Sequence, residues 1–205
     1  MNITKTEKSE AVKSIIDNSK LDISYLIINA AATIVACSGL MANSTAVIIG
    51  SMLIATLLSP IACTALALTT NNTNGIIKGS KSLLVGVFLV MAIAFLFGKF
   101  FPNIDTTNRM LARTEPGLFD FLIAFFGGLA GAIALLFKRY NGVMVGVGIA
   151  TALVPPLSTA GIFFAKVNYD LGLKAFELAL INIIFIMFAH FLVFKFFKLT
   201  YNPNE

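Results

Sequence analysis

Long apolar runs separated by short polar stretches dominate the chain from residue 22 onward. About 20 apolar residues in a helix cross the hydrocarbon of a bilayer, so each run predicts one membrane-spanning helix. Six spans are expected, at 22–41, 45–69, 79–101, 117–137, 142–165 and 171–197. The polar residues 1–21 carry a weak apolar stripe and predict an interfacial lead-in helix, while 102–116 form a polar connection and 198–205 a polar tail.

Two proline turns interrupt these runs at corresponding places. Ser59-Pro60 lies in the second run and Pro155-Pro156 in the fifth, with Pro60 and Pro156 separated by 96 positions. The same offset pairs Gly50 with Gly146, Leu57 with Leu153, Asn72 with Asn168, Lys78 with Lys174 and Phe95 with Phe191. Because each half has an odd number of spans, the second half must enter the membrane from the opposite side. The predicted fold is an all-α integral membrane protein of two inverted three-helix repeats, 22–101 and 117–197.

Each proline turn is expected to break its helix, at Ser59-Pro60 and at Pro155-Pro156. Proline has no N–H, and its ring clashes with the carbonyl of the preceding turn. Backbone groups freed in hydrocarbon must be satisfied by neighbouring protein or by a polar cavity, so paired breaks indicate a solute or ion site at the midplane. Freed carbonyls suit a cation, whereas the amide donors of the restarting helix suit an anion, and the sequence does not choose between them.

Hydroxyl and amide side chains surround the two turns. The residues expected to line the site are Thr56, Ser59, Pro60, Thr151, Pro155, Pro156, Ser158, Thr159 and Asn182. A hydroxyl in a membrane helix often bonds its own backbone or packs at a helix contact, and that alternative stands for each of them. Asn29 in the first run and Asn182 in the sixth either tie helices together or line the site.

Few ionisable residues lie near the apolar core. Asp120 is expected to cap the fourth helix, where a carboxylate meets a helix amino terminus favourably. Glu177 either pairs with Lys174 near the interface or, together with Asp120, couples charge to transport. His190 is the single histidine and is expected at the interface rather than in a proton relay.

The remaining chemistry of the chain is sparse. Cys37 and Cys63 are expected to be buried small hydrophobes, with no His or Cys partner at a metal-ligand spacing. No serine–histidine arrangement, paired carboxylate motif or phosphate-cradling glycine loop is present. The sequence therefore predicts no enzyme, no metal site and no cofactor.

Composition and charge place the chain in a membrane. Of its 205 residues 58% are hydrophobic and 12% are charged, whereas about a quarter are charged in soluble domains. The polar first twenty residues argue against a secretory signal peptide. The net charge of +5 is interpreted as membrane topology and not as nucleic-acid binding. Ten basic residues fall on the side of the termini and five on the other, which favours cytoplasmic termini.

Three stretches together resemble one family. They are Asn43 to Ile54 (NSTAVIIGSMLI), Glu115 to Asp120 (EPGLFD) and Ala150 to Leu157 (ATALVPPL). The chain is similar over about 22–195 to the hydrophobic bacterial and archaeal membrane proteins grouped as domain of unknown function 389. The family usually has a proline where this chain has Thr56, and many members carry an additional soluble domain. The resemblance implies a prokaryotic inner membrane and a fold, but no activity.

The sequence therefore predicts a transporter or channel for an ion or small polar solute, with its site between the two broken helices. Because six spans make a thin scaffold, a homo-oligomer in the lipid bilayer is expected. Two alternatives stay open at this stage. The chain could be a non-transporting scaffold or sensor subunit with purely structural breaks, or a lipid-handling protein with a side-open groove.

Overall fold

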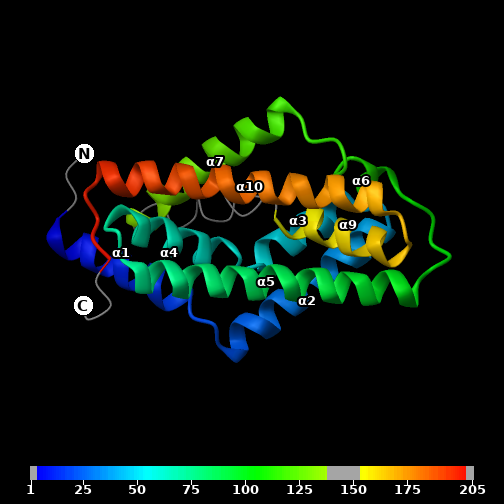
Figure 1. Ribbon diagram of the computed structural model, residues 1–205, viewed down its shortest axis with the longest axis horizontal. Coiled ribbons are helices and arrows are strands. Elements are labelled where there is room, and N and C mark those ends of the chain that lie inside the picture. Colours follow the sequence, from blue (N-terminus) through cyan, green and yellow to red (C-terminus); the bar gives the residue numbers. More distant parts are fainter. Residues whose placement is uncertain (1–3, 138–152, 202–205) are drawn as a thin grey trace.

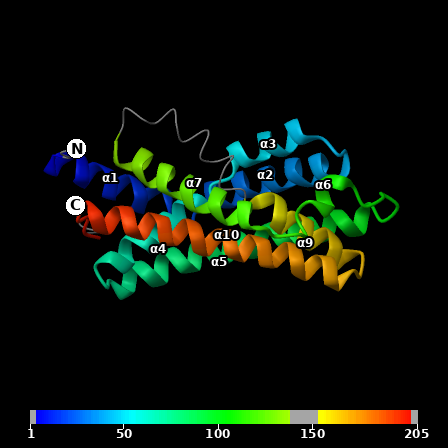
Figure 2. The same ribbon diagram turned by 90° about the horizontal axis from the view of Figure 1, so that it is seen from above.

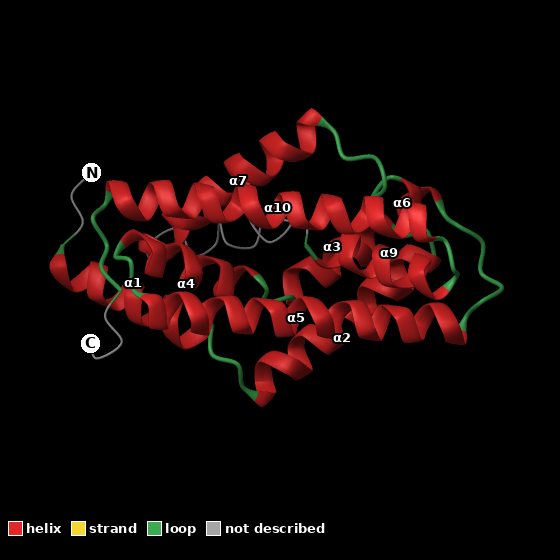
Figure 3. Ribbon diagram, in the orientation of Figure 1, coloured by secondary structure: helices red, strands yellow, loops and turns green. Residues whose placement is uncertain are grey.

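The computed structural model describes residues 4–137 and 153–201, and all regular secondary structure in these ranges is helical (Figures 1 and 3). The helices, in chain order, are α1 (Lys5–Asn18), α2 (Ile23–Met41), α3 (Thr45–Ile54), α4 (Leu58–Thr69), α5 (Thr73–Phe100), α6 (Asn108–Leu111), α7 (Leu118–Leu136), α9 (Val154–Ala165) and α10 (Tyr169–Phe196). The ranges expected from hydropathy therefore match the helices to within a few residues at most ends. The exceptions are α5, which begins six positions before the expected residue 79, and the fifth run, of which 142–152 lies outside the described residues.

Four of the described helices are long and apolar enough to cross a membrane: α2, α5, α7 and α10. The pair α3 and α4 counts as a fifth span if its two parts are taken together. α9 has 12 residues and is shorter than a full span. The structure thus describes an all-helical protein with four to five candidate spans.

The long helices α5 and α10 enclose the short helices α4 and α9. α4 and α9 both pack against α5 and against α10, while α2 covers α5 and α9, and α7 packs on α10. In Figures 1 and 2, α4 and α9 occupy opposite halves of the long axis, and α5 and α10 run in opposite directions. α4 and α9 have 12 residues each and α5 and α10 have 28 each, with all their ends displaced by the 96 positions found in the sequence.

α3 and α4 are bent by 48° at a three-residue break, Ala55 to Leu57. The expected position of the break, Ser59-Pro60, is corrected by this geometry, because both residues lie inside the first turn of α4. The reason is steric. Pro60 cannot donate to the carbonyl of Thr56 four residues earlier, and its ring would clash with that carbonyl, so the break precedes the proline by one turn. The first turn of a helix tolerates proline because its N–H groups have no partner within the helix.

The two termini lie at the same end of the molecule (Figure 1). α1 begins with a capping box between Thr4 and Glu7 and buries Ala11, Val12 and Ile15 in a cluster with α4 and α7. The Lys8 ammonium donates to the Phe197 carbonyl at 2.6 Å, which ties α1 to the end of α10. The lead-in helix expected at a membrane interface is therefore packed into the bundle.

Glycines allow the closest helix contacts. A Cβ placed on Gly161 of α9 would lie 2.6 Å from the Met91 carbonyl oxygen and 2.7 Å from the Ala94 Cβ, both on α5. Gly50 of α3, in contrast, has nothing within 4 Å of such an atom. The α5–α9 contact therefore depends on the absence of a side chain at Gly161.

Replacing Gly161 with Val should force α5 and α9 apart and lower the free energy of unfolding by about 1–3 kcal/mol, as other overpacked cores do. Gly50→Ala is the matched control and should be neutral or slightly stabilising, because alanine favours a helix. Thermal unfolding in detergent can be followed through the buried thiols of Cys37 and Cys63 with a thiol-reactive fluorophore. Equal melting temperatures for Gly161→Val and Gly50→Ala would contradict the packing described.

Candidate functional site

Asn29 of α2 holds the break between α3 and α4. Its side-chain amide donates to the Thr56 hydroxyl at 2.7 Å, and its Oδ1 accepts the Thr56 backbone N–H at 3.1 Å. The same amide nitrogen also donates to the Tyr25 carbonyl at 2.9 Å. A fully buried asparagine thus occupies the position where a helix carbonyl would normally accept the N–H of Thr56. Of the two roles weighed for Asn29, the described contacts are those of a structural tie.

Tyr25, one turn before Asn29, extends this network to α5. Its hydroxyl donates to the Ser82 carbonyl at 2.9 Å, and the neighbouring Gly86 leaves room for the ring because it has no side chain. Tyr25 was not distinguished by the sequence pattern, because one tyrosine in an apolar run is equally typical of an interfacial residue. The network fixes α2 against both α5 and the break.

At the first break, backbone acceptors and backbone donors both lack a backbone partner among the described residues, the donors being the N–H groups of Leu57 and Leu58. Within 4–137 and 153–201, no backbone N–H donates to the carbonyls of Met52, Leu53, Ile54 or Ala55. The Ser59 N–H bends back to the Thr56 carbonyl at 3.2 Å, and Pro60 has no N–H. The carbonyls at the end of a helix point along its axis, so those of α3 are directed into the gap before α4.

The second proline turn forms the start of α9. Pro155 and Pro156 are its second and third residues, and the Leu157 N–H bonds the Leu153 carbonyl at 3.3 Å. Ser158 and Thr159 follow in the next turn and are fully buried. Neither hydroxyl meets the geometric criteria for a hydrogen bond in the part of the chain that the structure describes, although that of Ser158 lies beside the Cys37 thiol of α2. Thr151 lies outside the described residues.

The two turns meet in one apolar cluster. Leu57 and Ile61 from the first turn share it with Leu153, Val154 and Leu157 from the second, together with residues of α2, α5, α7 and α10. The structure therefore brings apolar residues next to the two proline turns together. The surfaces that meet are leucine and isoleucine side chains, and the polar atoms lie around them.

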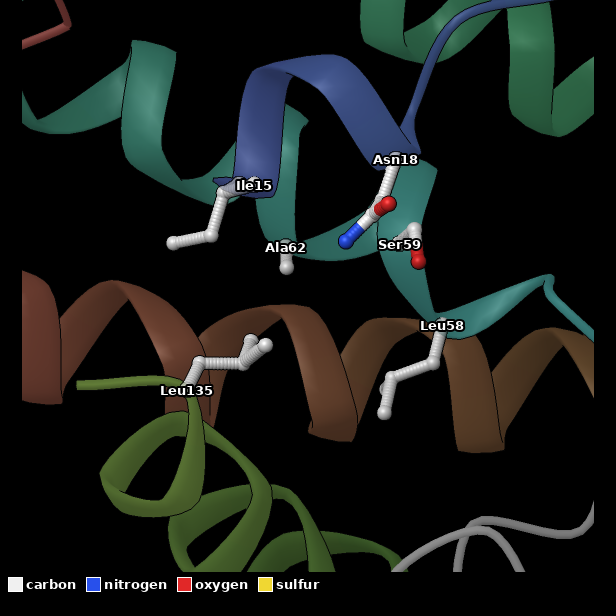
Figure 4. A pocket seen from close by; sticks show the side chains of 6 residues that line it. All are labelled: Ile15, Asn18, Leu58, Ser59, Ala62 and Leu135. Carbon is white, nitrogen blue, oxygen red and sulfur yellow. The ribbon is translucent and has the colours of Figure 1, made fainter. Parts of the chain in front are cut away.

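A small cavity of about 20 Å³ adjoins the first turn of α4, on the side of the termini. It is lined by Ile15, Asn18, Leu58, Ser59, Ala62 and Leu135, and Figure 4 shows the side chains of Asn18 and Ser59 beside each other at one end. This volume is about that of one water molecule, and the two polar side chains supply hydrogen-bond partners for it. The sequence did not distinguish Asn18, because only the packing of α1 brings it to Ser59.

The other candidate residues lie on α7 and α10. Asp120 accepts from the Gly117 N–H at 2.9 Å and so caps α7, as expected. Glu177 is exposed on α10, and Lys174 pairs with Asp170 at 2.9 Å instead of with Glu177. Asn182 is 7% exposed on α10.

The surroundings of His190 are described by its packing. It is fully buried within the bundle, with its Nδ1 2.9 Å from the Ile186 carbonyl and its ring edge-to-face with Phe194. Its interfacial depth, expected from the nearby Lys195, stays a prediction.

Comparison with known proteins agrees with the resemblance noted in the sequence. A family model described as "Domain of unknown function (DUF389)" matches residues 52–188. An uncharacterised protein of the archaeon Methanocaldococcus jannaschii, MJ0678, is 29% identical over 177 residues, which cover 86% of this chain and 54% of that protein. The chain thus spans about half the length of this curated relative. No solved structure matches the chain.

Replacing Asn29 with Leu should leave the Thr56 N–H without its acceptor in an apolar surrounding and cost about 1–3 kcal/mol of stability. Ser38→Ala on the same helix is the matched control, since Ser38 is exposed and bonds only the Ile34 carbonyl of its own helix. The melting temperature should fall for Asn29→Leu and stay unchanged for Ser38→Ala. In a double-mutant cycle, Thr56→Val should cost less in the Asn29→Leu background than alone. Additive effects would show that the two side chains do not interact.

Proposed function

Because the chain belongs to the DUF389 family, whose description assigns no activity, we propose its function from its geometry: a membrane transporter or channel for an ion or small polar solute. The site of this proposal lies between the first turns of α4 and α9. Its residues are Thr56, Ser59, Ser158, Thr159 and the freed backbone around them, with Asn182 alongside. Asp120 and Glu177 are kept as candidates for charge coupling.

The observation that carries the proposal is the meeting of the two proline turns in one cluster at the centre of the bundle. Backbone interrupted within a membrane is tolerated only where it is buried in protein or lines a water-filled cavity. Transporters with inverted repeats place their substrate between two such discontinuous helices. The equal lengths of α4 and α9 and of α5 and α10, and the opposite directions of the long pair, support such a repeat here (Figure 1).

In this proposal, the structure represents a closed state of the transporter. Leu57, Leu153 and Leu157 fill the space between the turns, so a solute reaches the site only when these side chains separate. The water-sized cavity at Asn18 and Ser59 would be the remnant of an access route from the side of the termini. α1 covers that route with Ile15 and Asn18.

The proposed topology has six spans, with 142–165 as the fifth, in a prokaryotic inner membrane. Both termini are assigned to the cytoplasm because basic residues concentrate on their side. A homo-oligomer is proposed because six spans make a thin scaffold. No enzymatic step is part of the proposal.

An apolar groove favours lipid handling as a second candidate function. Its volume is about 290 Å³, and it lies open at the surface between the ends of α2 and α5. The lining residues are Ser38, Met41, Ala42, Phe97, Phe101 and Ile104. Such a groove accepts an acyl chain, and lipid movement would be measured in the same vesicles with a fluorescent phospholipid. The third candidate, a non-transporting scaffold, predicts no movement of any solute or lipid.

Purified protein in liposomes should mediate flux of an ion or small polar solute, measured with trapped fluorescent indicators and compared with empty liposomes. Pro60→Ala and Pro156→Ala should each reduce that flux about tenfold or more, because they allow the broken helices to continue. Pro116→Ala, which changes a proline in the polar connection, is the matched control and should retain flux. Absence of flux for every class of solute would overturn the proposal.

The proposed topology makes Lys13 and Lys174 accessible from opposite sides of the membrane, since α1 and the start of α10 lie at opposite ends of the molecule (Figure 1). In intact cells, a membrane-impermeant thiol reagent should label Lys174→Cys and leave Lys13→Cys unlabelled until the cells are opened. The native cysteines are both buried and give a low background. The reverse labelling pattern would invert the orientation.

A further inference from the structure

One face of α5 is apolar and exposed over its first half, except for a lysine. Ile77, Lys81, Leu84 and Phe88 follow one another at spacings of four, three and four residues, so they lie on one face of the helix. The three apolar side chains are each more than half exposed, and Lys81 is exposed among them. An exposed apolar face of this kind marks a surface that contacts membrane lipid.

The length of α5 places Lys81 within the apolar layer of a membrane. Its 28 residues extend about 42 Å, whereas the hydrocarbon of a bilayer is about 30 Å thick. A helix centred in this layer extends about four residues beyond it at each end, so Ile77 lies at the edge and Lys81 one turn deeper. Helix side chains lean towards the amino terminus, and the long stem of a lysine carries its ammonium back to the headgroups.

A second lysine lies beside Lys81, and α5 supplies no carboxylate for either of them. Lys78 is also exposed and precedes Lys81 by three residues, which makes the two side chains neighbours on the helix. Residues 71–104 contain no Asp or Glu, and neither lysine forms an ion pair among the described residues. Because like charges at this spacing repel, an anion from outside the chain would stabilise this end of α5.

The corresponding end of α10 balances its charge within the chain. There, the Lys174 ammonium pairs with the Asp170 carboxylate at 2.9 Å. At the 96-position offset, Asp170 corresponds to Asn74 on α5, which is neutral. The second carboxylate of this part of α10, Glu177, likewise corresponds to Lys81. The two long helices therefore share their apolar pattern but differ in charge, and only the start of α5 has a surplus of cations.

We propose that Lys78 and Lys81 bind the headgroup of an anionic phospholipid whose acyl chains lie along Leu84 and Phe88. The ammonium groups match the negative charge of the headgroup, and the exposed apolar side chains match the acyl chains. A soluble anion would match the charge alone. This end of α5 lies at the end of the molecule that holds the termini (Figure 1). The inference requires that the chain lies in a membrane, but not that it transports a solute.

Native mass spectrometry of the purified full chain, stripped of lipid in detergent, measures the binding directly. Phosphatidylglycerol and phosphatidylcholine with the same acyl chains are the two probes, because they share the phosphate and differ in net charge. Phosphatidylglycerol should bind about tenfold or more tightly than phosphatidylcholine. Inorganic phosphate at equal concentration should not displace it. Equal affinity for the two lipids, or displacement by inorganic phosphate, would overturn the proposal.

Variants of the lysines test which residues hold the headgroup. Lys78→Gln and Lys81→Gln should each weaken phosphatidylglycerol binding about fivefold, whereas Lys81→Arg keeps the charge and should retain it. Lys99→Gln is the matched control, because Lys99 is exposed at the other end of α5 and its ammonium lies 5.7 Å from the centre of the Phe95 ring. Each variant is first checked for a cooperative unfolding transition. Equal losses for Lys81→Gln and Lys99→Gln would show attraction by net charge alone and overturn the site.

Flux in liposomes separates this inference from the proposed function. Selective binding of phosphatidylglycerol together with solute flux supports both. Selective binding without flux of any solute retains the lipid site and overturns the transporter. Flux without selective binding retains the transporter and overturns the lipid site, and the absence of both overturns both.

Discussion

Every backbone N–H and C=O in the hydrocarbon of a membrane needs a partner, and this requirement governs the whole arrangement. The two proline turns violate it locally, since proline cannot donate and the preceding turn must open. Asn29 restores the balance for one N–H, the Tyr25–Ser82 hydrogen bond fixes α2 against α5 beside it, and the long helices α5 and α10 enclose the remainder.

The two halves share a framework but differ in how they hold their turns. α4 and α9 correspond residue by residue at the 96-position offset, as do α5 and α10. The position that corresponds to Asn29 at this offset is Phe125 on α7, and that of Tyr25 is Phe121, which stacks on Phe185 with ring centroids 5.5 Å apart. The position on α7 that corresponds to Asn29 therefore has no side-chain amide with which to repeat this tie.

Much of the fold followed from hydropathy, whereas the details of the site did not. Apolar runs predicted α2, α7 and α10 closely because a membrane span has a minimum length, and the proline offset predicted the common bounds of α4 and α9. The membership of the DUF389 family, inferred from the ATALVPPL run and two other stretches, was confirmed. The break lay one turn before Ser59-Pro60 because the clash occurs at the carbonyl four residues upstream. The Asn29–Thr56 pair, the packing of α1 and the burial of His190 all depend on contacts between distant segments, which periodicity alone does not reveal.

The central claim is that the two proline turns form one solute site between the first turns of α4 and α9. An experimental density map of the full chain in a lipid nanodisc, at a resolution that shows ordered water, tests it most directly. The account predicts a class of particles in which Leu57, Leu153 and Leu157 separate and ordered water or solute density lies between the two turns. Dry apolar packing of these side chains in every class of particles would contradict it.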